Sequence, residues 1–437
     1  MSDVLLISVP FRARGIPVIF PIHLAALGSY LADRGHRVRV MDLNVEPPGA
    51  LAEALRGRRY DLVGAALRNV LPFFWIDRFR PLRRVVAELR AAGVTPVVGG
   101  PGFSLFAPAV FRWVPELRVG VIGEGEDALA RLAAGEKPET IPGVCRRTPE
   151  GLASNYPPRF LPGPEIPRYR DLEGLRVGDP RYLVGVQSYR GCAYECAHCP
   201  VRYLRGDEIR PRPLDAVRDD LLFLRARGVR HAFLIDGVFH HPLDRSRALL
   251  ALFRELGHPT SWEGFLKPGP DVTADLLREA AAAGGIRFHV DLITGSPRLG
   301  PLVNNHADPR DATRIATLLR DAGLQGVFYF AYDLPTETLS DERKSLRLMR
   351  RLRAGGHGTS VYPFYPYPGT RFETFYGRVL DKSALWHLLR VAKLLLRPSF
   401  PFFLRDMTRH DRLNGPKEIS PVGAVATAPE IARPGGD

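Results

Sequence analysis

Apolar residues in the first third of the chain gather in short runs, and longer amphipathic stretches separate these runs. Short apolar runs are typical of buried strands, and apolar positions that repeat every three to four residues predict helices. Strands joined by one helix each pair in parallel and form an open, doubly wound sheet. The strands are predicted at Val4 to Val9, Val38 to Leu43, Leu62 to Leu67, Thr95 to Val98 and Val119 to Ile122. The helices are predicted at Ile22 to Arg34, Ala50 to Leu55, Arg80 to Ala92 and Glu126 to Ala134.

A second alternating series begins at Tyr182, after a stretch from Lys137 to Pro180 whose Pro and Gly content is typical of a linker. Its six strand–helix units predict a partial (β/α)6 TIM barrel that is open on one side. The strands are predicted at Leu183 to Gln187, Ala232 to Asp236, Ser261 to Phe265, Arg287 to Ile293, Gly326 to Ala331 and Thr359 to Tyr365. The helices are predicted at Leu214 to Arg227, Arg245 to Leu256, Ala274 to Ala283, Ala312 to Ala322 and Ser340 to Ala354.

The length of 437 residues suits two or three domains, and the pattern predicts an α/β fold. A short basic, apolar helix is expected beyond about Trp386, and the Pro-, Gly- and Ala-rich tail from Asn414 is expected to be disordered. The predicted limits are 1–136 for a doubly wound, Rossmann-like domain, 137–181 for the linker, 182–380 for the partial barrel and 381–437 for the C-terminal helix and tail.

The composition is that of a globular protein, with 45% hydrophobic and 25% charged residues, and it excludes a collagen or a wholly disordered chain. The formal net charge is +14, and only 6 of the 61 basic residues are lysines. The arginines are scattered without a run of five or six like charges, which favours solvated helix faces over a nucleic-acid site. RNA or an acidic peptide is the alternative partner, because a basic surface attracts polyanions.

No stretch of about 18 apolar residues predicts a membrane span, so no membrane partner is expected. The first residues, Met-Ser-Asp before Val4, lack the basic region of a signal peptide. Only four cysteines are present, and three of them lie within eight residues. A tight cluster in a Cys-poor chain indicates metal or cluster ligation in a reducing cytosol rather than disulfides, so a cytoplasmic protein is expected.

Cys192, Cys196 and Cys199 follow the first predicted barrel strand, at the end where barrel enzymes carry their active sites. Three thiolates on one short loop can hold three irons of a 4Fe–4S cube and leave the fourth iron an open position. A zinc site with His198 or Cys145 as fourth ligand is the alternative. Zinc motifs usually come as two separated pairs, and the chain has no second pair.

The segment Arg-Gly-Cys-x3-Cys-x-His-Cys resembles the radical SAM enzymes, with His198 at their usual aromatic position. The resemblance implies that S-adenosyl-L-methionine (SAM) chelates the open iron. An electron, from a donor such as flavodoxin or ferredoxin, then splits SAM to a 5′-deoxyadenosyl radical. Further segments similar to this family are Arg210 to Pro213, Asp236-Gly237, Asp333 to Thr338 and Tyr365 to Thr370.

Two positions depart from the family pattern, since Ile293 stands where a Glu is common and Asp333 where a Gly is common. Both lie where the ribose of SAM or the substrate would be touched, so SAM is expected to bind in an unusual way. The resemblance implies cofactor contacts from Tyr194, His198, Asp236, Gly237, Thr294 and Ser296.

The N-terminal region carries four segments that resemble the cobalamin-binding domain of one radical SAM class. They are Pro21 to Leu31, Gly35 to Asp42, Val97 to Gly102 and Ile122 to Glu126. Glycines after strands let the backbone approach a bulky ligand closely, and a GxGxxG fingerprint for NAD is absent after the first strand. The Asp-x-His-x-x-Gly motif is also absent, which implies cobalamin without a protein histidine on cobalt. The implied contacts are Gly99, Gly100, Pro101, Gly102, Gly123, Glu124, Gly125 and Glu126.

Arg68 and Asn69 end the third predicted strand, on the side where the corrin is expected. A guanidinium has no lone pair to donate to cobalt. Arg68 beneath the corrin would therefore keep the lower axial position free of a strong ligand and ease methyl transfer, which gives it a catalytic role; Asn69 is expected to contact the cofactor. A surface or phosphate-contacting arginine is the alternative.

Together these features predict a cobalamin-dependent radical SAM methyltransferase that uses a 4Fe–4S cluster, SAM and cobalamin. The class resembled includes tryptophan 2-C-methyltransferase-like members. The expected reaction is methylation at carbon of a natural-product precursor, a small molecule or a peptide, through methylcobalamin, with or without an adenosyl radical. The alternatives are a rearrangement, cyclisation or ring contraction on the same scaffold, and a cluster- and cobalamin-binding sensor without turnover. Aromatic residues that could line a flat pocket are Tyr332, Tyr362, Phe364, Tyr365 and Tyr367.

Overall fold

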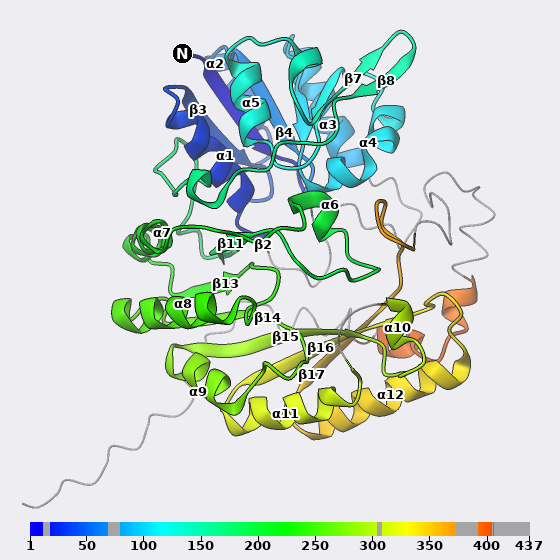
Figure 1. Ribbon diagram of the computed structural model, residues 1–437. Coiled ribbons are helices and arrows are strands. Elements are labelled where there is room, and N and C mark those ends of the chain that lie inside the picture. The colour runs from blue at the N-terminus through cyan, green and yellow to red at the C-terminus, as the bar shows by residue number, and fades with distance from the viewer. Residues whose placement is uncertain (12–17, 69–78, 304–307, 373–391, 404, 406–437) are drawn as a thin grey trace, which may run out of the picture.

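The computed structural model describes residues 1–11, 18–68, 79–303, 308–372, 392–403 and 405. Two sheets, one mostly and one wholly parallel, lie one above the other in Figure 1 and form two domains with a band of short elements between them. The expected α/β fold, a doubly wound domain followed by a partial barrel, is confirmed.

The N-terminal sheet has seven strands in the order β3-β1-β4-β5-β6-β7-β8. β1 pairs in parallel with β3 on one side and β4 on the other, so the strand order reverses beside β1. Ligands of such sheets bind beyond the carboxyl ends of the strands at that reversal. The strands are β1 (Asp3–Ser8), β3 (Arg37–Asp42), β4 (Leu62–Ala66), β5 (Val97–Gly99) and β6 (Val119–Val121). The helices are α1 (Ile22–Ala32), α2 (Ala50–Gly57), α3 (Arg80–Ala91), α4 (Pro101–Trp113) and α5 (Glu126–Ala133).

Helix α4 was not expected from the sequence. It is apolar on nearly all sides, so it lacks the periodic polar face that marks an amphipathic helix. Pro108 lies inside it, and the helix is kinked at Phe106, whose φ is −122° and ψ is 23°. A proline removes one helical hydrogen bond and crowds the preceding turn, which accounts for the kink.

The first part of the predicted linker forms a hairpin. β7 (Val144–Thr148) pairs antiparallel with β6 and with β8 (Gly151–Ser154), so the N-terminal sheet extends to residue 154. The two strands are short, β7 is polar after Cys145, and β8 is mostly exposed, which explains why no strand pattern was visible.

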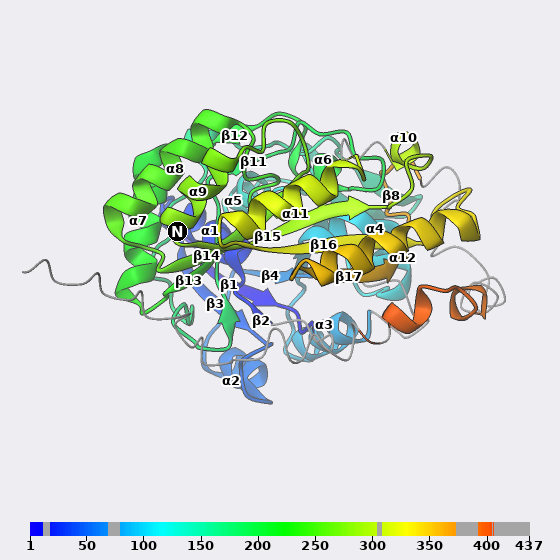
Figure 2. The ribbon, with the colours of Figure 1, turned by 90° about the horizontal axis from the view of Figure 1, so that it is seen from below.

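The barrel sheet has six parallel strands in the order β10-β13-β14-β15-β16-β17, and the predicted open barrel is confirmed. Figures 1 and 2 show the long helices on its outer side. The strands are β10 (Gly185–Val186), β13 (His231–Leu234), β14 (Ser261–Leu266), β15 (Gly285–Ile293), β16 (Gln325–Tyr332) and β17 (Gly358–Pro363). The helices are α7 (Leu214–Ala226), α8 (Leu243–Leu256), α9 (Ala274–Ala282), α11 (Asp311–Asp321) and α12 (Leu339–Ala354).

Short elements between the two sheets hold the cysteine segment, as Figure 1 shows around α6. One small ribbon pairs β11 with β12, and another pairs β2 with β9 across the domains. These elements are β2 (Val18–Ile19), β9 (Tyr182–Leu183), β11 (Tyr189–Arg190), α6 (Val201–Arg205), β12 (Arg210–Pro211) and α10 (Gly300–Val303). Two 3-10 turns, Pro138–Thr140 and Gly163–Glu165, complete the described elements.

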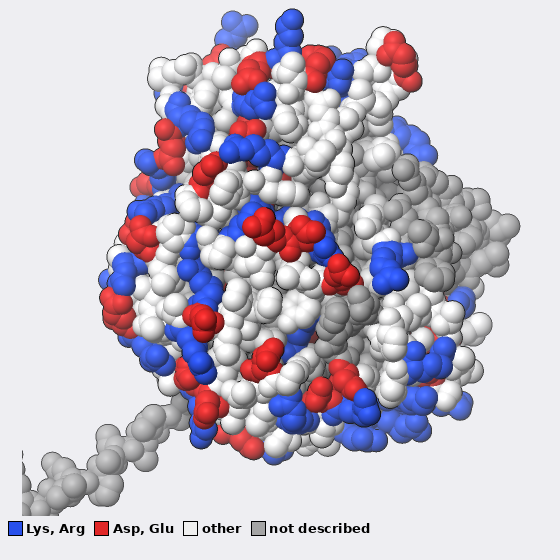
Figure 3. All heavy atoms as spheres, in the orientation of Figure 1, with Lys and Arg blue, Asp and Glu red and all other residues white. Residues whose placement is uncertain are grey.

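The expected helix near Trp386 and the expected tail from Asn414 fall outside the described residues, in whole or in large part. Within the described ranges, no helix has the length and apolarity needed to cross a bilayer. Figure 3 shows basic and acidic side chains interspersed on the face in view, and many arginines pair with a carboxylate, such as Arg218 with Glu255.

Candidate functional site

A cavity of about 1010 Å³ lies between the carboxyl ends of the two sheets. From the N-terminal domain it is lined by the loops after β5 and β6, and from the barrel by the cysteine segment and by the ends of β13, β14 and β15. This volume is at the upper end of ordinary ligand pockets, so the cavity has room for a large ligand. Both predicted sites therefore open into one space.

The cysteine loop places all three thiols on this cavity. Cys192, Cys196 and Cys199 each line it, and β11 leads directly into the loop. Gly191 has a φ of +87°, and a Cβ there would lie 1.8 Å from the carbonyl oxygen of Glu208, so only glycine permits this entry. The Arg-Gly pair before the first cysteine thus has a steric reason.

The three thiols do not converge on a single-ion site. No group of three or more His, Cys, Asp or Glu side chains in the described part of the chain is placed to hold one metal ion. Burial raises the pKa of Cys199 to about 12, and it raises that of Cys196, which the Lys267 ammonium lowers in part. Cys145 lies apart in β7, buried in the N-terminal core, where burial raises its pKa to about 11. The zinc alternative therefore loses one of its two candidate fourth ligands.

Asp236 and Gly237 end the second barrel strand beside the cysteine loop, and both line the cavity. Asp236 accepts hydrogen bonds from the backbone N–H of Ser188 at 2.8 Å and of Tyr189 at 3.2 Å. Burial raises the pKa of this carboxyl to about 6, although the bonds from Ser188 and Tyr189 lower it in part. A Cβ at Gly237 would lie 3.4 Å from Sγ of Cys192, so a larger side chain would enter the space beside that thiol. Asp236 thus fixes the backbone that leads into the cysteine loop, and Gly237 leaves space beside the Cys192 thiol.

A buried ion-pair cluster joins the two domains at the cavity. Arg190, two residues before Cys192, pairs with Glu126 at 2.7 Å and with Glu124 at 3.1 Å. Arg210 of β12 pairs with Glu124 at 2.6 Å. Burial alone would raise the pKa of Glu124, but the two guanidiniums lower it overall. The predicted cofactor residues Glu124 and Glu126 line the cavity, and their carboxylates bind the cysteine loop.

The N-terminal half of the cavity is lined largely by main chain, glycines and aliphatic side chains. Gly99, Gly100 and Pro101 after β5, and Gly123 and Gly125 after β6, all line it. Gly100 has a φ of +89°, and a Cβ there would lie 2.8 Å from the carbonyl oxygen of Leu67. Gly102 does not line the cavity; it begins α4 and donates its N–H to the same carbonyl at 2.9 Å. From these loops a slot runs between the sheet and the helices α1 and α5. Its wall residues are Leu6, Leu24, Leu27, Gly64, Ala65, Ala66 and Leu129.

Arg68 does not line the cavity. Its Nη1 donates to the carbonyl oxygen of Ile19 at 3.3 Å. Burial lowers its pKa, and the charge of Asp42 raises it in part. His23 does line the cavity next to it, and burial lowers the pKa of His23 to about 3. Asn69 falls outside the described residues. The axial role of Arg68 stays a prediction.

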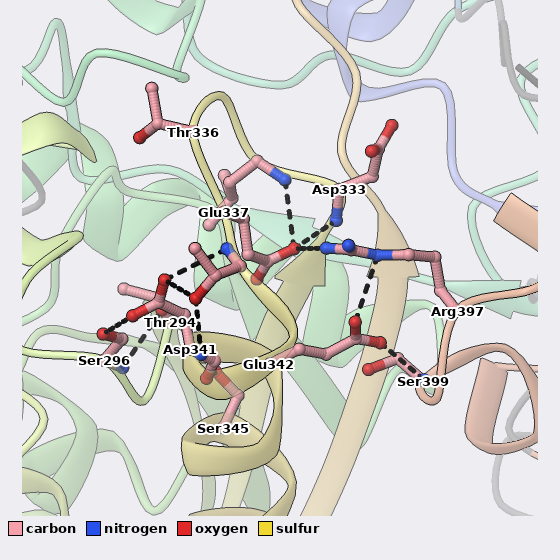
Figure 4. Close-up of polar contacts among 12 residues, drawn as sticks. Thr294, Ser296, Asp333, Thr336, Glu337, Asp341, Glu342, Ser345, Arg397 and Ser399 are labelled. Carbon is pink, nitrogen blue, oxygen red and sulfur yellow. Dashed lines mark hydrogen bonds and ion pairs between the residues drawn. The ribbon is translucent and has the colours of Figure 1, made fainter. Parts of the chain in front are cut away.

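Thr294 and Ser296 are bonded within the protein. Figure 4 shows Ser296 pointing to Asp341 at the start of α12; its hydroxyl donates to Oδ1 of Asp341 at 2.6 Å, and its N–H donates to Oγ1 of Thr294 at 3.1 Å. Asp341 also caps α12 in a capping box with Thr338. Both hydroxyls are buried and neither residue lines the cavity, so a contact with SAM stays a prediction without geometric support.

The two departures from the family pattern, Ile293 and Asp333, both have positive φ, of 65° and 63°. Such values are uncommon for residues with a Cβ. Asp333 follows β16, and in Figure 4 its N–H points to Glu337, whose carboxylate accepts it at 2.6 Å and also pairs with Arg397. The strand-end turn is thus held by the C-terminal segment.

Tyr194 and His198 lie in the cysteine loop but not on the cavity wall. His198 pairs through Nε2 with Asp291 of β15 at 3.1 Å, which ties the loop to the barrel. The Tyr194 ring lies 5.0 Å from Nζ of Lys267. Both contacts position the loop, and a direct cofactor contact from either residue stays a prediction.

Several cavity residues carry no local motif and were not predicted as site residues. Strand alternation points Glu263, Phe265 and then Lys267 to the barrel interior, while Trp262 packs outward against the helices. This alternation was the one available signal. Further unpredicted residues on the wall include His289, Asp291 and Tyr329. Of the five aromatic candidates, Tyr362 and Tyr367 line the cavity, whereas Tyr332, Phe364 and Tyr365 are buried in the core.

Comparison with known proteins assigns a family to each domain. Residues 17–133 match the B12 binding domain, and residues 186–349 match the Radical SAM superfamily. The first range holds the glycine loops, and the second holds the cysteine loop and strands β13 to β16.

Several known proteins are similar to most of this chain. A tryptophan 2-C-methyltransferase of Streptomyces laurentii is 25% identical, over 81% of this chain and 72% of its own. The structure of the methyltransferase TsrM from Kitasatospora setae, with cobalamin and a [4Fe-4S] cluster bound, superposes with a TM-score of 0.75 at 24% identity, covering 86% and 78%. That of the cobalamin-dependent enzyme OxsB gives 0.66 at 16% identity, covering 80% and 52%.

The chain is therefore a cobalamin-dependent radical SAM enzyme. Its cofactors are a 4Fe–4S cluster, SAM and cobalamin. The residues present fit them. Three thiols face one space with room beside Cys192, and the slot of glycine, alanine and leucine residues opens from the N-terminal sheet into that same space.

Proposed function

We propose that this enzyme transfers a methyl group from SAM to a carbon atom of a small-molecule or peptide precursor of a natural product. The observation that carries the proposal is the shared cavity, because the cobalamin slot and the cysteine loop open into one volume of about 1010 Å³. A substrate in that volume would reach both cofactor sites without leaving the protein. The tryptophan methyltransferase among the relatives supports the same reaction class.

Each part of the cavity has a defined task in this proposal. Cys192, Cys196 and Cys199 hold the cluster, and Asp236 fixes the backbone that leads into their loop. The Gly99–Gly102 and Gly123–Gly125 loops admit the corrin by their small size. When bound, cobalamin supplies methyl-carrying chemistry, and SAM at the cluster supplies methyl groups and hydrogen-abstracting chemistry. The buried ion pairs of Arg190 with Glu124 and Glu126 hold the two cofactor sites in a fixed position relative to each other.

The test is methyl transfer by the fully loaded enzyme. The protein is reconstituted anaerobically with iron, sulfide and cobalamin, and incubated with SAM labelled at the methyl carbon and with extracts of its host. A chemical reductant replaces the predicted flavodoxin or ferredoxin. We expect the label in a new carbon–methyl bond of one product. SAM cleavage with an unlabelled, rearranged product would favour the alternative of rearrangement or ring contraction, and binding of SAM without any consumption would favour a sensor.

A further inference from the structure

A chain of hydrogen bonds on the floor of the barrel interior has no task in the function described so far. His289 of β15 bonds through Nε2 to Oε2 of Glu263 at 2.9 Å, and through Nδ1 to the hydroxyl of Tyr329 at 2.8 Å. His289 and Tyr329 line the cavity, whereas Glu263 lies beneath them. The chain thus runs from a buried carboxylate to the cavity wall.

The carboxylate of Glu263 is held in its ionised form. It also accepts from Nε2 of His231 at 3.2 Å and from Nη1 of Arg287 at 3.3 Å. Burial would raise its pKa, but the bonds from His231 and His289 lower it overall. An ionised carboxylate only accepts hydrogen bonds. The Nε2 atom of His289 must therefore donate to Glu263.

This fixes the direction of the remaining bonds. A neutral imidazole that donates through Nε2 accepts through Nδ1, so the Tyr329 hydroxyl donates its proton to His289. Burial raises the pKa of Tyr329, so the hydroxyl keeps that proton. With its one proton committed, the Tyr329 oxygen has only a lone pair to offer a further partner. It can accept a hydrogen bond but cannot donate one.

The part of the cavity wall next to His289 and Tyr329 is aromatic. The ring centroids of Phe233 and Phe265 are 5.3 Å apart, and that of His289 lies 5.1 Å from Phe233. The His289 and Tyr329 rings stack at 5.8 Å with an interplanar angle of 22°. Phe265 keeps 37% of its surface exposed although it points into the barrel, so this aromatic layer has open space above it. Such walls suit a planar ring.

We propose that Tyr329, oriented by His289 and Glu263, is the substrate-recognition group and selects an aromatic substrate that bears a ring N–H or O–H. Rings that offer only an acceptor at that position leave the Tyr329 lone pair unpaired and are rejected. The inference rests on the proposed function, because it treats the cavity as the substrate site. It adds the substrate class, which the cofactor sites do not specify.

Matched ring pairs test this directly by binding. The enzyme loaded with cluster and cobalamin is titrated calorimetrically at about pH 8.5 with indole and 1-methylindole, and with phenol and anisole. We expect indole and phenol to bind about fivefold to tenfold more tightly than their methylated partners, the effect of one hydrogen bond. Tyr329→Phe should remove this preference and Glu263→Gln should reduce it. Tyr362→Phe, at another tyrosine of the cavity wall, should keep it.

The inference is overturned if the native enzyme binds both members of each pair equally, if it binds none of the four, or if Tyr329→Phe retains the preference. The comparison of ligand pairs in the native enzyme needs no variant, so it tests the inference even if a variant fails to fold. The outcome is independent of methyl transfer. A preserved preference without labelled product would reject the proposed function alone, and labelled product without a preference would reject this inference alone.

Discussion

The two halves of the cavity are built by opposite means. The N-terminal half is made largely of main chain, glycines and aliphatic side chains, such as Gly64, Gly99 and Leu129, whereas the barrel half presents chemically active side chains, such as Cys192, Lys267 and Tyr329. The first half accommodates a large cofactor by leaving space, and the second acts through specific atoms. We therefore expect the first half to be sensitive to added bulk, and the second to be sensitive to the loss of single functional groups.

The largest effect is expected at the cysteine loop. Changing Cys192, Cys196 or Cys199 to Ala should abolish the visible absorbance of the cluster and all SAM turnover, because each thiol holds one iron. Cys145→Ala is the matched control and should lose neither, since Cys145 is buried in β7 away from the cavity. Loss of iron in the Cys145 variant, or stoichiometric zinc in the native protein, would contradict the assignment.

The next effect concerns the ion pairs that join the halves. Arg190→Met leaves the buried Glu126 without this arginine partner, and it leaves Glu124 with Arg210 as its remaining one. The substitution should lower the free energy of unfolding, measured by denaturant titration, by about 3–5 kcal/mol. The pKa of Glu124 is lowered in the folded state. Its stabilising contribution is thus present above the ordinary Glu pKa and is lost as the pH falls through the lowered value. The difference between native protein and variant should therefore shrink as the pH falls below about 4.5.

An exposed pair provides the control for this substitution. Arg218 and Glu255 pair at 2.5 Å on the surface of the barrel, with 37% and 59% of their side chains exposed. Arg218→Met should cost no more than about 1 kcal/mol, because water screens the charges. Equal losses in the two variants would show that the buried cluster is not the link between the domains that the structure indicates.

A smaller effect is expected from added bulk in the N-terminal slot. A Cβ at Gly64 would lie 3.1 Å from Cδ2 of Leu6 and 3.4 Å from Cδ2 of Leu129. Gly64→Val should therefore narrow the slot and weaken cobalamin binding by about tenfold to a hundredfold, with the cluster absorbance unchanged. Gly57→Val, where a Cβ meets nothing within 4 Å, should bind as the native protein does. Unchanged affinity in the Gly64 variant would move cobalamin out of this slot.

The smallest and most specific effect concerns Arg68. If it keeps the lower cobalt face free, Arg68→His should still bind cobalamin but transfer methyl about tenfold more slowly, a barrier change of about 1.4 kcal/mol. Nitrogen hyperfine coupling should then appear in the paramagnetic spectrum of bound cob(II)alamin. Arg68→Lys keeps the positive charge but loses the planar, bidentate hydrogen-bonding geometry of the guanidinium. If Arg68→Ala only lowers cobalamin affinity, with unchanged turnover at saturation, the phosphate role holds and the axial one is wrong.

Sequence patterns revealed the parts of the molecule that depend on local order. The strand and helix alternation predicted both sheets, and the spacing of Cys192, Cys196 and Cys199 predicted that they act together. Helix α4 was missed because it is buried and lacks an amphipathic face. The hairpin of β7 and β8 was missed because its strands are short and partly polar.

The remaining parts of the site depend on contacts between residues far apart in the chain. Arg190 meets Glu126 across 64 positions, and His289 meets Tyr329 across 40, so no local motif marks either pair. Thr294 and Ser296 show the opposite case. The family pattern marked them as cofactor residues, but the Ser296 hydroxyl donates to Asp341 in the capping box of α12, and Oγ1 of Thr294 accepts the N–H of Ser296.

The central claim is that one cavity brings the two cofactor sites together, and magnetic coupling between the cofactors tests it most directly. The enzyme is loaded with cob(II)alamin and a cluster reduced to its paramagnetic state, and its spectrum is compared with that of Cys192→Ala, which should lack the cluster. We expect the native spectrum to show the cobalt signal broadened or split by the neighbouring cluster, and the variant to show an unperturbed cobalt signal. Two independent, uncoupled signals in the fully loaded native enzyme would contradict a shared cavity.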